Sequence, residues 1–273
     1  MSKNAPKLTR FRLTIQYDGT DFHGSQLQPE VRTVQGELEA ALSGLADRRT
    51  RVDFAGRTDA GVHALGQETA FDLPARWEPD ELGRALGAVL PEDIAPGLPR
   101  IVDAGFHPRF DADRRRYLYV VAPGTLGVSP FTRRTAWRSN AGGPGLDDGE
   151  ETLATLDRLA ALVSGERDFD SFAKRGQPER GTRCAVESAG WRRHGAGYLL
   201  FDITADRFLH HMVRYLVGTM VEIAAGRRPE SDLEALLAGD TATRAVFPAP
   251  PGGLYLSAVR YPDGWNRAAD LPW

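Results

Sequence analysis

Strict alternation of apolar and polar residues over positions 10–17 is the feature that most limits how this chain can fold. The apolar residues of this segment share one face and are Phe11, Leu13, Ile15 and Tyr17. A period of two is typical of a β-strand that buries one face and exposes the other. Residues 116–122 alternate in the same way, and residues 198–204 and 254–261 are also strand-like. The chain is therefore expected to build half-buried strands.

Helical patterns lie between these strands, so the sequence predicts an α+β fold. Apolar residues recur at helical spacing after Thr33 and after Pro79. Two further helices are predicted over residues 151–163 and 208–225, the second ending at Gly226.

The order strand, turn, helix occurs twice in the chain, which suggests two α+β halves that face each other across a cleft. We expect residues 1–106 to form an N-terminal domain that carries Asp59. Residues 107–273 are expected to form a C-terminal domain, with a loop rich in Gly and Asp near residues 141–150.

Composition restricts the setting in which this chain works. Its 273 residues include one cysteine, Cys184, so no internal disulfide can form and a reducing cytoplasm is expected. No apolar run is long enough to span a bilayer, and the N-terminus lacks the apolar region of a secretory signal. The net charge of −3 means that any surface for nucleic acid must be local, as in the arginine cluster at residues 114–116.

A segment punctuated by glycines, Phe54–Ala64, carries the strongest chemical signal. Asp59 lies between Gly56 and Gly61, and Arg57 precedes it by two residues. Glycines allow tight turns and close approach, and a neighbouring guanidinium favours an ionised carboxylate. Asp59 is therefore either a reactive group at a cleft or a residue that only caps a turn.

This segment resembles the signature loop of the tRNA pseudouridine synthase A family, over Gly56–Ala64 followed by Gly66 and Gln67. Further segments with the same resemblance occur in the family's order and are Tyr17–Thr20 with Thr33–Gln35, Arg115–Tyr119, Phe208–Arg214, and Ala249–Pro250 with Gly253–Leu256. The resemblance extends over roughly residues 10 to 262.

The resemblance implies two similar domains whose antiparallel sheets meet in a central mixed sheet, with the active site between them. It also implies isomerisation of uridine to pseudouridine in the anticodon stem-loop of tRNA, at tRNA positions 38–40, by a homodimer. Asp59 is then the catalytic nucleophile or base. Whether it attacks the base, attacks the sugar or removes a sugar proton stays open.

Four other positions are expected to share the site. The resemblance places Tyr117 at the family's active-site tyrosine, where it could stack on an extruded uracil or move a proton. It also implies that Arg214 pairs with Asp59. The alternative is that Arg214 pairs with a residue close to it in the sequence, such as Glu222 or Asp206. Arg57 is expected to contact RNA phosphate or hold the flipped base, and Leu254 to line the uracil pocket.

Arg115 and Arg116 are further candidates for RNA contact. No cofactor and no metal are expected, because adjacent histidines such as His210 and His211 point in different directions on a helix and nothing completes a ligand set. One departure from the family pattern is Ser25, where a large aromatic residue is usual, which puts a packing or RNA-facing contact in doubt.

Two other functions remain open on the residues alone. A glycosidase would need a second carboxylate, for which Asp18, Asp21 or Asp53 is available. A noncatalytic RNA-binding module would use the arginines without Asp59. Analysis of the reaction product separates all three.

Overall fold

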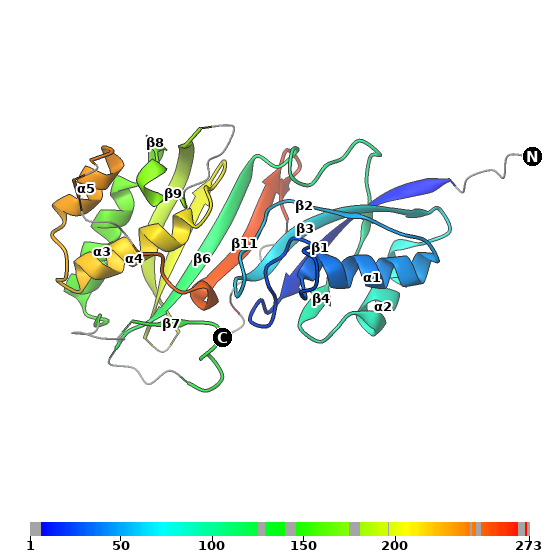
Figure 1. The fold of residues 1–273 in the computed structure, drawn as a ribbon, viewed down its shortest axis with the longest axis horizontal. Coiled ribbons are helices and arrows are strands. Elements are labelled where there is room, and N and C mark those ends of the chain that lie inside the picture. Colours follow the sequence, from blue (N-terminus) through cyan, green and yellow to red (C-terminus); the bar gives the residue numbers. More distant parts are fainter. Residues whose placement is uncertain are drawn as a thin grey trace, which may run out of the picture. The chain divides into compact units, whose positions relative to one another are not determined.

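The computed structural model describes residues 7–124, 129–139, 146–174, 181–195, 197–240, 242–243, 247–266 and 271. Within them the chain forms two compact units (Figure 1). Unit 1 holds the described residues of Met1–Asp113 and of Leu256–Pro272, and unit 2 holds those of Arg114–Tyr255.

This division differs from the expected one in two ways. The first boundary falls after Asp113 instead of residue 106, and the segment from Leu256 onward returns to unit 1. Local alternation identifies residues 254–261 as a strand but does not reveal which strand they pair with, so the return could not be predicted.

Unit 1 is built on a sheet in the order β4-β1-β3-β11, in which β1 is antiparallel to both β3 and β4. Its long strands are β1 (Leu8–Tyr17), β3 (His63–Pro74) and β11 (Leu254–Tyr261), of which residues 256–261 belong to this unit. The short strands are β2 (Val52–Phe54), β4 (Ile94–Pro96), β5 (Arg100–Ile101) and β12 (Gly264–Trp265). The register pairs Phe11 with Phe71 and Tyr17 with Ala64.

Two helices cover one face of this sheet, α1 (Val34–Ala46) and α2 (Pro79–Val89) (Figure 1). The hydroxyl of Thr33 accepts a hydrogen bond from Gly36 N and caps α1, as the sequence predicts. The helix buries Val34, Leu38 and Leu42, and the predicted apolar face of β1 is buried as well. Arg12 is an exception, since it lies on the predicted polar face and is only 9% exposed.

Unit 2 contains the strands β6 (Arg114–Ala122), β10 (Tyr198–Ala205), β9 (Arg183–His194) and β8 (Gly165–Asp168), which are antiparallel neighbours in that order. The short strand β7 (Trp137–Arg138) runs parallel to β6, which makes this sheet mixed. Each unit thus combines a sheet with helices, and the predicted α+β class is confirmed.

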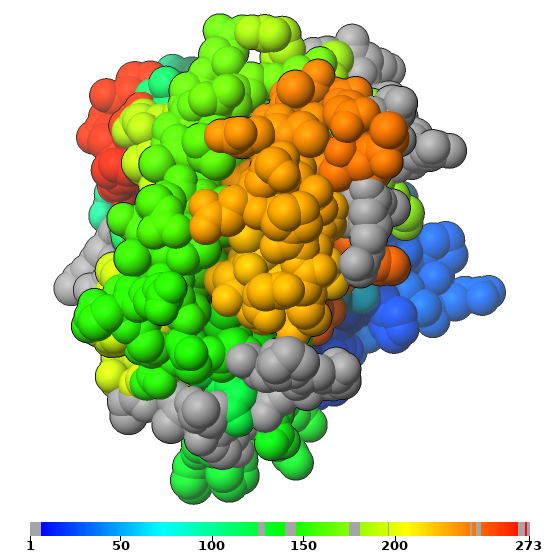
Figure 2. All heavy atoms as spheres, turned by 90° about the vertical axis from the view of Figure 1, so that its left-hand side faces the viewer, coloured from blue at the N-terminus to red at the C-terminus, as the bar shows by residue number. Residues whose placement is uncertain are grey.

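The described part of unit 2 also contains α3 (Glu150–Leu162), α4 (Met212–Ala224) and α5 (Ser231–Leu237). Both α3 and α4 contact β9, and α5 contacts the segment Asp170–Phe172. Two 3-10 turns accompany them, at Asp170–Phe172 and Pro251–Gly253. Figure 2 shows the helical face of unit 2, with α4 and α5 in yellow to orange beside the green of α3. None of the helices that the structure describes is long and apolar enough to cross a membrane.

The helix predicted over residues 208–225 begins four residues later, at Met212. His211 precedes it with φ of 66°, in the left-handed region, so the backbone turns sharply before the helix starts. Residues 141–145 of the expected loop lie outside the described residues.

Candidate active site

The segment that carries Asp59 connects β2 to β3 in unit 1. Ala55 N donates to Glu68 O at 2.8 Å, which closes the strand pair, and Val62 N donates to Asp59 O at 3.1 Å, which forms the turn after the aspartate. Asp59 is half-buried, Arg57 is exposed and Thr58 between them is buried. The loop therefore exposes Arg57 to solvent and holds Asp59 at an intermediate depth.

Two buried residues hydrogen-bond to the backbone of this loop. Gln67 accepts from Gly56 N at 3.3 Å and donates to Gly56 O at 2.8 Å. The hydroxyl of Ser25 accepts from Thr58 N at 2.9 Å, and Ser25 N donates to Thr58 O at 3.0 Å. The Tyr17 hydroxyl lies 2.8 Å from Oγ1 of Thr58, and burial raises the pKa of Tyr17 to about 12.

A neighbouring segment, residues 18–25, packs directly against the loop. A Cβ at Gly19 would lie 2.0 Å from the carbonyl oxygen of Val62, and one at Gly24 would lie 2.9 Å from that of Thr58. Gly24 also has φ of 96°, which side chains rarely allow. The two segments are in backbone contact, and only glycine fits at these positions.

His63 lies where the loop enters β3 and contacts the same segment. Its Nδ1 lies 3.1 Å from Gly19 N and 3.1 Å from Oδ1 of Asp18. This nitrogen serves one of them at a time, accepting from Gly19 when unprotonated and donating to Asp18 when protonated. The pKa of Asp18 lies well below its ordinary value. The largest cause is the hydrogen bond with His63, and the hydrogen bonds from Thr20 lower the pKa further.

Unit 2 contains the remaining predicted site residues. Tyr117 is buried on β6 opposite Ile203, and its ring meets the edge of Phe208 with ring centres 4.9 Å apart. Arg116 forms an ion pair with Asp202, with Nε 2.8 Å from Oδ1, and Arg115 donates to Asp206 O at 3.0 Å. These two arginines are therefore tied to neighbouring acidic residues of unit 2.

Arg214 lies in the first turn of α4 and is half-buried. Its Nε donates to Ala249 O at 2.7 Å, and Ala249 N donates back to Arg214 O at 2.9 Å. Because Arg214 and Asp59 belong to different units, their pairing stays a prediction.

Leu254 follows the segment around Ala249 to which Arg214 is hydrogen-bonded, and it is 6% exposed at the start of β11. The Tyr119 hydroxyl donates to Pro250 O at 2.7 Å, and a Cβ at Gly253 would lie 2.7 Å from the Tyr119 ring. Burial raises the pKa of Tyr119 well above its ordinary value. These contacts connect Arg214, Tyr119 and Leu254 within unit 2.

The structure thus gathers the predicted residues into two sets, Asp59 with Arg57 in unit 1, and Tyr117, Arg115, Arg116, Arg214 and Leu254 in unit 2. Sequence reasoning did not identify the roles of Ser25, Tyr17 and Tyr119. Gln67 and Tyr17 do lie within the motifs that carry the family resemblance, but nothing in the residue pattern indicates that Ser25 hydrogen-bonds to Thr58.

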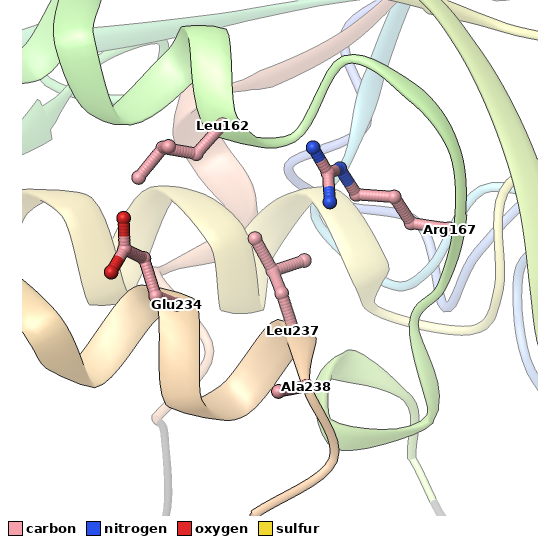
Figure 3. A pocket seen from close by; sticks show the side chains of 5 residues that line it. All are labelled: Leu162, Arg167, Glu234, Leu237 and Ala238. Carbon is pink, nitrogen blue, oxygen red and sulfur yellow. The ribbon is translucent and has the colours of Figure 1, made fainter.

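A separate hollow lies in unit 2 between α3, β8 and α5 (Figure 3). Its lining residues are Leu162, Arg167, Glu234, Leu237 and Ala238. Nε of Arg167 donates to Ser164 O at 3.1 Å. No residue predicted for the active site lines this hollow.

Comparison with known proteins gives consistent matches over nearly the whole chain. The family model described as tRNA pseudouridine synthase matches residues 13–111 and 159–262. A tRNA pseudouridine synthase A of Chlorobium luteolum is 40% identical over 260 residues, which cover 95% of this chain and 98% of the relative. Proteins of the same name from Roseiflexus castenholzii and Escherichia coli are 43% and 38% identical, covering 94% and 98% of this chain and 93% and 94% of the relatives.

Proposed function

Because this chain belongs to the tRNA pseudouridine synthase A family, we propose that it isomerises uridine to pseudouridine in the anticodon stem-loop of tRNA, with Asp59 as the reacting carboxylate. The observation that carries the proposal is the half-buried position of Asp59 on a loop whose backbone is hydrogen-bonded on both sides of it. A loop backbone held in this way fixes the point from which the carboxylate extends, which favours a preorganised reacting group.

The reaction needs no added reagent, because it is neutral in oxidation state and in mass. The N1–C1′ bond of uridine breaks, and a C5–C1′ bond forms. The proton from C5 leaves to solvent, and N1 gains a proton. Asp59 either attacks as a nucleophile or acts as a base in this sequence. We therefore propose catalysis without a cofactor or a metal ion.

The target base must leave the helical stack before the carboxylate can reach it. We propose that Tyr117 stacks against the extruded uracil or exchanges a proton with it, and that Leu254 lines the pocket for the ring. Arg214 is proposed as the ion-pair partner of Asp59. Its hydrogen bond to Ala249 supports a fixed position for the guanidinium.

Three arginines are proposed to contact tRNA. Arg57 is exposed beside Asp59, which suits a phosphate or the flipped nucleotide. Arg115 and Arg116 are already engaged with Asp206 and Asp202, so contact with RNA would have to share or replace these bonds. The net charge of −3 makes such local groups important for binding a polyanion.

We further propose that the protein works as a homodimer in the cytoplasm. A second copy would extend the surface available to a long RNA. A reducing compartment suits Cys184, which is buried and has no disulfide partner. Burial also raises the pKa of its thiol to about 12, so it is poorly suited to act as a nucleophile.

The experiment that tests the proposal measures tritium release from tRNA transcripts labelled at C5 of uridine. The parent protein should release tritium without added cofactor and without a change in RNA mass, and pseudouridine should map to the anticodon arm. The variant Asp59→Ala should release none while its affinity for tRNA stays within about threefold. Turnover that survives this substitution would refute the assignment of Asp59.

The same assay separates the competing functions. A glycosidase would give free uracil and an abasic site, and a binding module would leave the RNA unchanged. Either product pattern from the parent protein would contradict the proposed isomerase.

A further inference from the structure

Four consecutive peptide groups before Asp59 are each held by a side chain or backbone group from another part of unit 1. Gln67 bonds to the N–H and C=O of Gly56, and Ser25 bonds to the N–H and C=O of Thr58. Because alternate residues are held through both of their polar atoms, every peptide plane from residue 55 to residue 59 has a partner.

The last of these planes ends at Asp59 itself. The carbonyl of Thr58 belongs to the peptide group whose nitrogen is that of Asp59, and Ser25 N donates to this carbonyl at 3.0 Å. On the other side, the carbonyl of Asp59 accepts from Val62 N at 3.1 Å. The backbone of the aspartate is therefore held before and after its Cα.

Burial makes the loss of any of these hydrogen bonds costly. Ser25 is 1% exposed, Gln67 is 0% exposed and Thr58 is 7% exposed. Water has little access to replace a lost partner, so a rotated peptide group would leave buried polar atoms unpaired. A loop with exposed backbone could relax at small cost, but this one cannot.

The side-chain hydroxyl of Ser25 has one described bond, from Thr58 N at 2.9 Å. Thr58 in turn orients its own hydroxyl toward Tyr17. The exposed Arg57 lies between the two held residues, and Asp59 follows the second. The small polar side chain at position 25 thus acts on the two residues proposed to meet the substrate.

We infer that Ser25 is a positioning residue for Asp59, and that its hydroxyl sets the rate of the chemical step more than the affinity for tRNA. This inference rests on the proposed function, because it concerns the same carboxylate. Ser25 does not itself touch the reacting atoms; it acts through the Thr58 peptide group.

Ser25→Ala removes the hydroxyl acceptor and keeps the backbone donor to Thr58 O. We expect the single-turnover rate of tritium release to fall about ten- to a hundredfold, because a displacement of about 1 Å in a reacting group has an effect of this order. The Kd for tRNA, measured by filter binding, should stay within about threefold, since the RNA contacts lie mostly elsewhere.

A matched control separates positioning from general loss of stability. Leu86 is buried on α2 and has no proposed part in the reaction. Leu86→Val or Leu86→Ala, whichever matches the unfolding midpoint of Ser25→Ala, should keep the parent rate. An equal loss of rate in this control would overturn the inference.

A second variant keeps the test decisive if Ser25→Ala does not fold. Tyr17→Phe removes only the hydroxyl that contacts Thr58 and keeps the ring that packs against Phe22. A fall in the single-turnover rate of a few fold at unchanged Kd supports the inference, and a rate within the error of the parent contradicts it.

The outcomes also distinguish this inference from the proposed function. A parent protein that releases no tritium from any tRNA refutes the function. If the parent is active and Asp59→Ala is inactive, but Ser25→Ala turns over within twofold of the parent, the function stands and the positioning role of Ser25 fails. A loss that appears only in Kd also refutes the positioning role.

Discussion

Glu68 offers a sharp test of the physical reasoning, because a charge pair lies buried in unit 1. Its side chain is 0% exposed, and its Oε2 lies 2.6 Å from Nε of Arg12. Asn266 donates to the other oxygen, Oε1, at 2.8 Å, and the hydroxyl of Thr14 donates to the same oxygen. The Arg12 guanidinium also lies over the ring of Tyr261, 4.1 Å from its centre.

Replacing Glu68 with Leu removes the buried anion and leaves the cation in place. Among the described residues, the other carboxylate paired with Arg12 is that of Asp263, at 3.4 Å and 71% exposed, which is too solvated to compensate. Loss of one partner of a buried pair costs about 3–5 kcal/mol. This is a large share of the roughly 5–15 kcal/mol that stabilises a folded protein.

The double variant Arg12→Met/Glu68→Leu should regain much of this loss. An apolar replacement of both partners is often neutral, because no unpaired charge is left behind. We expect it to be more stable than Glu68→Leu alone by about 2 kcal/mol or more, which a double-mutant cycle reports as coupling.

Urea unfolding at pH 7, followed by tryptophan fluorescence, provides the free energies. Asp72→Ala is the control, since its carboxylate bonds Arg10 but is 46% exposed, and it should cost about 1 kcal/mol or less. A cost below about 1 kcal/mol for Glu68→Leu, or additive effects in the double variant, would refute the argument that this pair is energetically coupled.

Three other perturbations test separate parts of the structure. Gly253→Ala places a Cβ 2.7 Å from the Tyr119 ring and should lower the free energy of unfolding by about 1–3 kcal/mol. Gly87→Ala, with open space around it, should not destabilise the protein and serves as the control. Chemical denaturation compares the two variants. The pKa of Tyr17 in the folded protein is about 12, compared with an ordinary value of 10.0. Its contribution to stability is therefore complete below pH 10 and is lost as the pH rises toward 12. The parent should lose stability relative to Tyr17→Phe between these two pH values. The pKa of Asp18 is lowered from 3.8, so its contribution is present above about pH 4 and is lost below it; the stability difference between the parent and Asp18→Asn should therefore shrink as the pH falls below 4.

Local patterns predicted the regular elements well. The alternation in residues 10–17 identified β1 and its buried face, and Thr33 marked the cap of α1. Both depend on neighbours within a few residues, which a sequence displays directly. Leu254–Tyr261 was also predicted as a strand with the observed bounds.

Long-range partners could not be predicted in this way. Arg12 occupies the polar face of its strand, yet Glu68, 56 residues away, pairs with it in the interior. The helix pattern from Phe208 gave no sign that His211 would adopt φ of 66° and delay the start of α4. Ser25 reaches Thr58 across 33 residues, so its contact with the Asp59 loop was not predicted.

The return of β11 to unit 1 has a consequence for synthesis on the ribosome. Residues 256–261 neighbour β3, but they emerge only after all of unit 2 has been made. Until then the nascent N-terminal unit has β3 without this neighbour, and an open strand edge is a template for wrong pairing. Unit 1 is thus completed late, through contacts between residues that are far apart in the sequence. We therefore expect the nascent chain to depend on chaperones or on rapid release from the ribosome.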